Sequence, residues 1–140
     1  MAKKLNYDPN EKCKQAIVFA RVSSKKQKDK GVSLDVQMET ITQYCIDNGL
    51  KIVKDLSIDE SSTRGERKQY HEMLDFAKTC AGKIAIIVNY VDRLQRSYDD
   101  TYELNKLRKE GKIEIHFLKE SLIITKDSAA MDLTFWNMHV

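Results

Sequence analysis

The chain has 140 residues, of which 41% are hydrophobic, and this is enough for one domain with a well-formed core. Its 24 basic and 21 acidic residues leave a net charge of +3, which is compatible with a nucleic-acid partner without requiring one. The 3 cysteines lack C-x-x-C spacing, which argues against a disulfide scaffold or a zinc site. No apolar run approaches the ~18 residues of a membrane span, and the lysine-rich start is unlike a secretory leader, so a cytoplasmic protein without membrane contact is expected.

The first apolar run leads directly to two chemically active side chains. Residues 1–14 are polar and predict a flexible lead-in, after which a buried strand is expected at about 15–20. Arg21 and Ser23 follow it and are two residues apart, so an extended backbone points both side chains to the same side, whereas Ser24 points away. A cation and a hydroxyl at the carboxyl end of a central strand lie where open α/β sheets place their chemistry.

Strands and helices alternate along the rest of the chain. Apolar residues at helical spacing after Ser33 predict a helix to about Asn48, and Gly49 is a good stop signal. The later elements are expected as a strand at 52–58, a helix from about Arg67, a strand at 84–88, a helix from Ser97 to Gly111, a strand at 113–118 and a short strand at 122–125. This order predicts an α/β fold whose central sheet has four to five mostly parallel strands and helices on both faces.

The last segment, residues 127–140, predicts a helix that is apolar on most of its circumference. Its apolar side chains form two stripes, one with Met131, Phe135 and Met138 and the other with Ala129, Leu133, Trp136 and Val140. Such a helix does not lie on a surface without a partner, and no stop signal follows it. We therefore expect the beginning of a longer helix, with burial in the core of this domain as the alternative.

A second strand end also leads into arginines. Asp92, Arg93 and Arg96 follow the strand at 84–88, and Arg67 opens a helix after a polar loop. The guanidinium group is always charged and binds phosphate through two hydrogen bonds. A single arginine is more often a surface ion-pair partner, and Asp92 fits an ion pair or a helix cap equally well. Two strand ends that bring a hydroxyl and several guanidinium groups together nevertheless predict a phosphate site.

Other kinds of phosphate chemistry are disfavoured. The sequence has no histidine or carboxylate set at metal-ligand spacing, and none of its 5 glycines lies in a phosphate-binding loop motif. Metal-assisted phosphoryl transfer and nucleotide binding are therefore disfavoured, and neither a metal nor a cofactor is expected. A small phosphatase is also less favoured, because no cysteine or aspartate nucleophile stands in a phosphate-cradling loop. A hydroxyl nucleophile with arginines supplying positive charge remains.

With these residues in view, the chain resembles the catalytic domain of the serine recombinases, the resolvase/invertase family. The matching segments are ARVS at 20–23, SLDVQ at 33–37, the stretch from 59 to 68 and DRLQR at 92–96. They occur in the order and approximate spacing of the family, and the loop at 25–32 is similar to that of the large serine recombinases. Phe19 stands where a tyrosine is common, and residues 89–91 stand where a lysine is frequent, which puts a lysine contribution from that strand end in doubt.

The resemblance implies a three-layer, resolvase-like domain at 15–126 and, at 127–140, the start of a long oligomerisation helix. The family's DNA-binding region is absent from these residues. The implied function is metal-independent, site-specific recombination of double-stranded DNA by a homodimer that assembles into a homotetramer. A non-catalytic, DNA-bound regulator or interaction module built on the same domain is the alternative.

The resemblance also implies a role for each candidate site residue. Ser23 would attack the DNA phosphodiester and form a phosphoserine link to the 5′ end. The residues implied around the phosphate are Arg21, Arg67, Arg93 and Arg96. Asp92 and Asp59 would support these arginines, and Gln37 would help to position the loop that carries the serine.

Overall fold

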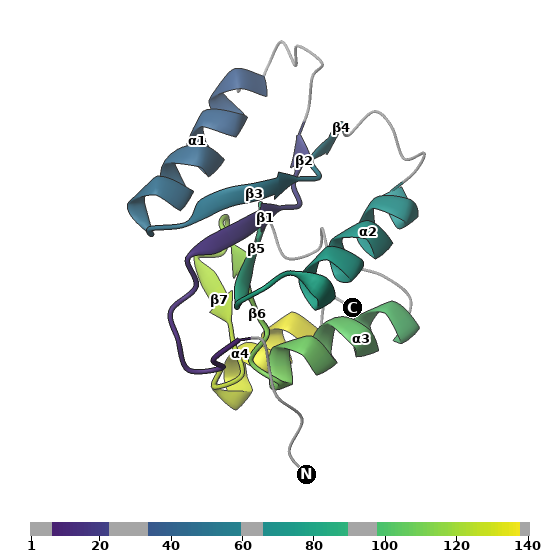
Figure 1. Ribbon diagram of the computed structural model, residues 1–140. Helices are drawn as coiled ribbons and strands as arrows, with labels where there is room; N and C mark the ends of the chain where they lie inside the picture. The colour runs from purple at the N-terminus through teal and green to yellow at the C-terminus, as the bar shows by residue number, and fades with distance from the viewer. Residues whose placement is uncertain (1–6, 23–33, 60–65, 90–97, 138–140) are drawn as a thin grey trace.

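The computed structural model describes residues 7–22, 34–59, 66–89 and 98–137, and its centre is a five-stranded sheet in the order β3-β1-β5-β6-β7 (Figure 1). Its strands are β1 (Gln15–Val18), β3 (Lys51–Asp55), β5 (Ile84–Val88), β6 (Ile113–Phe117) and β7 (Leu122–Ile124). The first four strands of this set are parallel, and β7 is antiparallel to β6. A separate two-stranded parallel sheet consists of β2 (Arg21–Val22) and β4 (Ile58–Asp59).

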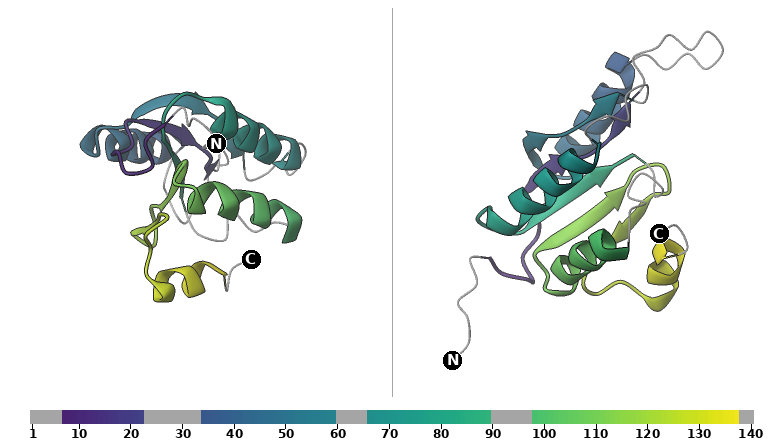
Figure 2. Two further views of the ribbon diagram at one scale, coloured as in Figure 1. Left: turned by 60° about the horizontal axis from the view of Figure 1, so that its bottom comes forward. Right: turned by 90° about the vertical axis from the view of Figure 1, so that its right-hand side faces the viewer.

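Helices cover both faces of the five-stranded sheet and complete three layers (Figures 1 and 2). They are α1 (Leu34–Asp47), α2 (Glu66–Thr79), α3 (Tyr98–Lys109) and α4 (Ala130–Asn137). Alternate residues of β5 serve the two faces: Ala85 and Ile87 belong to the cluster under α1, whereas Ile84, Ile86 and Val88 belong to the cluster under α2, α3 and α4. All five are fully buried. The α/β class, the mostly parallel sheet and the helices on both faces are therefore as the sequence predicts.

The first predicted strand is split in the structure. β1 ends at Val18 rather than at residue 20, and β3 ends at Asp55 rather than near residue 58; the chain resumes pairing as β2 and β4. Phe19 and Ala20, which form the link, are both fully buried but belong to opposite clusters. A run of apolar residues indicates that a segment is buried, but it does not indicate which strands the segment pairs with. The sequence therefore does not reveal where the strand leaves the main sheet.

The C-terminal helix α4 is buried on one side only. Trp136 is 3% exposed and Leu133 packs against the same core, whereas Met131 is 81% exposed and Phe135 is 41% exposed. Leu133 and Trp136 of one predicted stripe therefore pack on the domain, whereas Ala129 of the same stripe is exposed. Met131 and Phe135 of the other stripe face outward, and Met138 and Val140 lie outside the described residues. α4 has 8 residues, and its continuation as a long helix stays a prediction.

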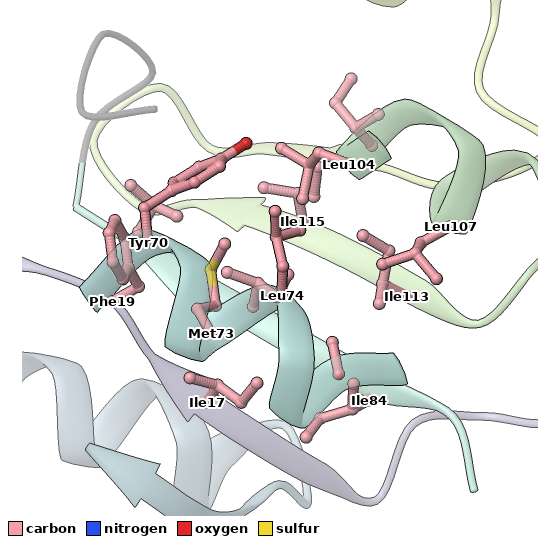
Figure 3. Close-up of a cluster of buried hydrophobic side chains, with 14 of the residues drawn as sticks. Ile17, Phe19, Tyr70, Met73, Leu74, Ile84, Leu104, Leu107, Ile113 and Ile115 are labelled. Atoms are coloured by element: carbon pink, nitrogen blue, oxygen red, sulfur yellow. The ribbon is translucent and has the colours of Figure 1, made fainter. Parts of the chain in front are cut away.

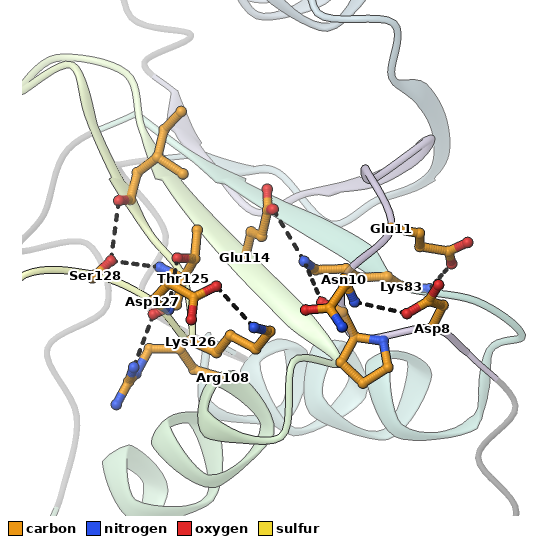
Figure 4. A network of polar contacts seen from close by, with 12 residues as sticks. Asp8, Asn10, Glu11, Lys83, Arg108, Glu114, Thr125, Lys126, Asp127 and Ser128 are labelled. Atoms are coloured by element: carbon orange, nitrogen blue, oxygen red, sulfur yellow. Dashed lines mark hydrogen bonds and ion pairs between the residues drawn. The ribbon is translucent and has the colours of Figure 1, made fainter.

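Residues 7–14 contact the rest of the domain at several points, and the flexible lead-in expected at 1–14 stays a prediction. Cys13 is only 4% exposed, and the Tyr7 hydroxyl donates a hydrogen bond of 3.0 Å to the Glu110 carbonyl oxygen. The Lys83 ammonium, which is labelled in Figure 4, donates to the Pro9 carbonyl oxygen at 3.2 Å. These contacts follow no periodic pattern of residues, so they cannot be predicted from the sequence.

Among the described residues, no helix has the length and apolar character needed to cross a membrane.

Candidate active site

The carboxyl ends of β1 and β5 lie side by side at one end of the sheet. Val18 is paired with Ile87, and the Phe19 amide donates a hydrogen bond of 2.8 Å to the Ile87 carbonyl oxygen. Because the two strands are parallel and adjacent, the segments that follow them leave the sheet from the same end. Ser23 and Arg93 follow β1 and β5 in the sequence, but both lie outside the described residues.

The small β2–β4 sheet places Arg21 and Asp59 on neighbouring strands. Arg21 is paired with Ile58 and Val22 is paired with Asp59. Beyond the end of the main sheet, the chain therefore forms a second parallel pairing, between β2 and β4. The backbones of two predicted site residues become neighbours in this way, although they are far apart in the sequence. The roles of their side chains stay predictions.

Arg67 lies in the first turn of α2, and the beginning of this helix is held against the end of β1. Tyr70, one turn further along, contacts Phe19 with 6.0 Å between ring centroids. Both rings are fully buried. The backbone of Arg67 is therefore positioned at the same end of the sheet as that of Arg21.

Gln37 lies in the first turn of α1 and is half-buried. α1 contacts β2, so the helix that carries Gln37 flanks the strand that carries Arg21. The role of Gln37 in positioning the serine loop stays a prediction.

The remaining predicted residues fall outside the described part of the chain. Ser23 lies within residues 23–33, and Asp92, Arg93 and Arg96 lie within residues 90–97. Across the described ranges, no three or more histidine, cysteine, aspartate or glutamate residues form a group suited to a metal ion. The described part of the site is thus the scaffold: β2, β4 and the starts of α1 and α2.

A buried polar network that the sequence analysis missed connects α1 to the sheet. Tyr44 Oη lies 2.6 Å from Nδ1 of His116, and Nε2 of His116 lies 3.2 Å from a carboxylate oxygen of Glu114. Since Nε2 faces a carboxylate, it carries the proton, and Tyr44 donates to Nδ1. Lys83 Nζ completes the network at 3.3 Å from Glu114. The available signal was the two-residue spacing of Glu114 and His116, which places both side chains on one side of a strand.

The electrostatics of this network favour a charged glutamate. The hydrogen bond from His116 lowers the pKa of the Glu114 carboxyl below its ordinary value; burial opposes this shift, and the Lys83 ammonium adds to it. The carboxylate is thus ionised at neutral pH and anchors both basic partners. Through Tyr44, the network ties α1, and with it Gln37, to the central sheet.

Comparison with known proteins gives a consistent result. The sequence matches the family described as "Resolvase, N terminal domain" over residues 16–139. No curated protein sequence matches the chain significantly. Among solved structures, the N-terminal catalytic domain of TP901-1 integrase is similar at 25% identity with a TM-score of 0.60, covering 90% of this chain and 91% of that one.

Two further solved structures share the fold. A resolvase family site-specific recombinase from Streptococcus pneumoniae is 17% identical with a TM-score of 0.61, over 89% of this chain and 83% of that one. The C-terminal catalytic domain of ISC1926 TnpA, an IS607-like serine recombinase, is 24% identical with a TM-score of 0.52, over 86% of this chain and 75% of that one.

Proposed function

Because the chain belongs to the resolvase family of serine recombinases, we propose that it cleaves and rejoins double-stranded DNA through a covalent link to Ser23. The chain is the catalytic domain of a site-specific recombinase, an enzyme class that acts on DNA. The observation that most supports the finer mechanism is the meeting of three elements at one end of the sheet. β2 contributes Arg21, β4 contributes Asp59 and α2 contributes Arg67.

In the proposed cleavage step, Ser23 Oγ forms a bond to phosphorus while the bond from phosphorus to the 3′ oxygen breaks. The serine gives up its proton and the departing 3′ oxygen gains one, so the products are a phosphoserine joined to the 5′ end and a free 3′ hydroxyl. The phosphoserine ester conserves the energy of the broken bond. A 3′ hydroxyl from another strand then reverses the step, and rejoining needs no ATP.

The arginines would stabilise the charge that this step creates. A phosphodiester carries one negative charge and gains about one more as the serine attacks. We assign this stabilisation to Arg21, Arg67, Arg93 and Arg96, each through charge-assisted hydrogen bonds of about 1.5–3 kcal/mol. We also assign the proton transfers to Arg67 or Arg96. Asp92 and Asp59 would orient the arginines, and Gln37 would support the serine loop.

Exchange of two double strands requires more than one subunit, and α4 offers the surface for this assembly. Met131 and Phe135 expose 81% and 41% of their surface on the outer side of the helix. Exposed apolar side chains that line one face of a helix are typical of subunit contacts. We propose that this face contributes to a homodimer and, during exchange, to a homotetramer.

The decisive experiment compares two adjacent serines in the full protein. Ser23→Ala should abolish the covalent protein–DNA adduct, whereas Ser24→Ala should leave it largely intact, when denatured reactions on recombination-site DNA are separated by gel electrophoresis. The assay is run in excess EDTA, in which wild-type adduct formation should persist. Adduct that survives in Ser23→Ala, or that disappears only in Ser24→Ala, contradicts the assignment of the nucleophile.

A further inference from the structure

We infer that the buried aromatic pair of Phe19 and Tyr70 positions Arg21 and Arg67 relative to each other for DNA cleavage. The inference rests on the proposed function of this site. Neither ring touches the DNA in this role; both are positioning residues that act through the backbone segments of the two arginines.

Phe19 is fixed at the point where the chain leaves the main sheet. It lies in the link between β1, which ends at Val18, and β2, which begins at Arg21. The Phe19 amide donates to the Ile87 carbonyl oxygen at 2.8 Å, and the Val18 carbonyl oxygen accepts from the Leu56 amide at 2.7 Å. The Phe19 side chain is fully buried. The ring is therefore attached to a backbone segment that hydrogen bonds hold on both sides, two residues before Arg21.

Tyr70 occupies the corresponding place on α2. It follows Arg67 by three residues, so both lie on one face of the helix, one turn apart. Its side chain is fully buried, in the cluster that also contains Met73 and Leu74 (Figure 3). The first turn of α2 therefore cannot move relative to the core without moving this ring.

The two rings meet edge to face. Their centroids are 6.0 Å apart and their planes are inclined by 74°, which is a favourable aromatic geometry. An aromatic side chain has only two torsions, so it transmits a displacement instead of absorbing it. The ring contact thus determines the spacing between the Arg21 segment and the Arg67 helix at a place close to both arginines.

This spacing matters more for the chemical step than for DNA binding. The two guanidinium groups must reach the same phosphate while its charge increases, and a displacement of about 1 Å at a reacting centre can cost ~100-fold in rate. DNA affinity depends on the sum of many phosphate contacts and is less sensitive to one spacing. Loss of either ring should therefore slow cleavage at saturating DNA and leave the dissociation constant nearly unchanged.

The test measures single-turnover adduct formation and DNA affinity separately in the full protein. Tyr70→Leu and Phe19→Leu should each slow adduct formation by ~10–100-fold at saturating DNA, with a Kd within about threefold of wild type. Tyr70→Phe keeps the ring and should restore a rate within about threefold of wild type. The double variant Phe19→Leu/Tyr70→Leu should be no slower than about the slower single variant, because both substitutions break the same contact.

Leu107→Ala is the matched structural control. Leu107 is buried in the same cluster but lies away from the aromatic pair, beside Ile113, as Figure 3 shows. All variants are compared at a temperature at which circular dichroism shows each one to be folded; if Tyr70→Leu does not fold, Phe19→Leu replaces it. Leu107→Ala should lower Tm and keep the cleavage rate.

The outcomes separate this inference from the proposed function. An unaltered rate in Tyr70→Leu, an equal loss of rate in Leu107→Ala at comparable Tm, or a loss in Tyr70→Phe as large as that in Tyr70→Leu would overturn the positioning role alone. Independent, multiplying effects of the two Leu substitutions would do the same. If wild type forms no adduct, or Ser23→Ala still forms it, the proposed function fails and the inference fails with it.

Discussion

At the amino end of the sheet, buried lysines make hydrogen bonds and an ion pair. At the carboxyl end, the five-stranded sheet stops and the short strands β2 and β4 pair beyond it. Lys112 is 2% exposed and donates to the carbonyl oxygens of Cys80 and Gly82, at 2.5 Å each. Lys83 is 7% exposed and pairs with Glu114 at 3.3 Å. Buried charges persist only where several partners surround them, so these lysines are structural.

The carboxyl end has a different composition and, under the proposed function, a different task. The candidate residues Arg21, Asp59 and Arg67 all occupy the ends of elements there, beyond the last pairing of the main sheet. In open α/β sheets, ligands bind at the carboxyl ends of the strands. We therefore expect the opposite end, with its buried lysines, to contribute mainly to stability. The comparison teaches that the two ends should respond to substitution in opposite ways: rate changes at one end, and stability changes at the other.

The largest effect is expected at the carboxyl end. Arg67→Ala should slow adduct formation by about 10²–10³-fold, because one donor to the developing charge is lost. The Tm should stay close to wild type. Lys68→Ala is the control, since Lys68 is the exposed next residue of α2 and carries the same charge. Equal losses in both variants, measured under single-turnover conditions, would show that general positive charge and not the arginine position matters.

At the amino end, Lys112→Met should reverse this pattern. The substitution removes the ammonium donor from the carbonyl oxygens of Cys80 and Gly82, so the free energy of unfolding should fall by ~1–3 kcal/mol in urea titrations. The cleavage rate of the folded protein should not change. Lys109→Met, at an exposed position of α3, should leave stability within ~0.5 kcal/mol of wild type. A loss of rate in Lys112→Met would break the division between the two ends.

Two glycines refine the comparison further. Gly111 has φ of 76°, and a Cβ atom built on it would lie 2.7 Å from Cβ of Pro9, so Gly111→Ala meets both backbone strain and a clash with residues 7–14. Gly49 has φ of 67°, and apart from its chain neighbours no described residue has an atom within 4 Å of a Cβ built there, so Gly49→Ala meets the strain alone, about 1–2 kcal/mol. Gly111→Ala should therefore be the more destabilising in urea titrations. Equal losses would mean that residues 7–14 contribute little to stability.

The smallest effect is expected from Cys13, at alkaline pH. Burial, and next the charge of Glu114, raises the pKa of the Cys13 thiol from 9.0 to about 12. Below pH 9 the thiol is protonated in the folded and the unfolded chain alike. Between pH 9 and about 12 the unfolded chain loses this proton while the folded chain keeps it, so the free energy of unfolding falls across that window.

Cys13→Ala should make this alkaline decline shallower. The measurement is urea unfolding at a series of pH values above 8. Identical slopes for wild type and Cys13→Ala would contradict the burial of the Cys13 thiol at the amino end of the sheet.

Much of the architecture could be predicted from the sequence because each feature is local. The apolar run at 84–88 is the fully buried β5, and Gly49 and Gly111 follow helices with positive φ, as helix stops require. The apolar spacing of Tyr70, Met73 and Leu74 also corresponds to the buried face of α2. Hydrophobic periodicity and backbone stereochemistry act within a few residues, so they are legible in the chain itself.

The sequence by itself therefore determined the order of the elements, the α/β class and the segments that resemble the serine recombinases. Only the tertiary structure decided that the first strand breaks after Val18 to pair again as β2, that residues 7–14 pack under the sheet, and that Tyr44 meets His116 across 72 positions of sequence. The ring contact between Phe19 and Tyr70 is likewise visible only in the tertiary structure. These contacts connect residues distant in the chain, and their energy depends on the distance between groups after folding, which no local pattern encodes.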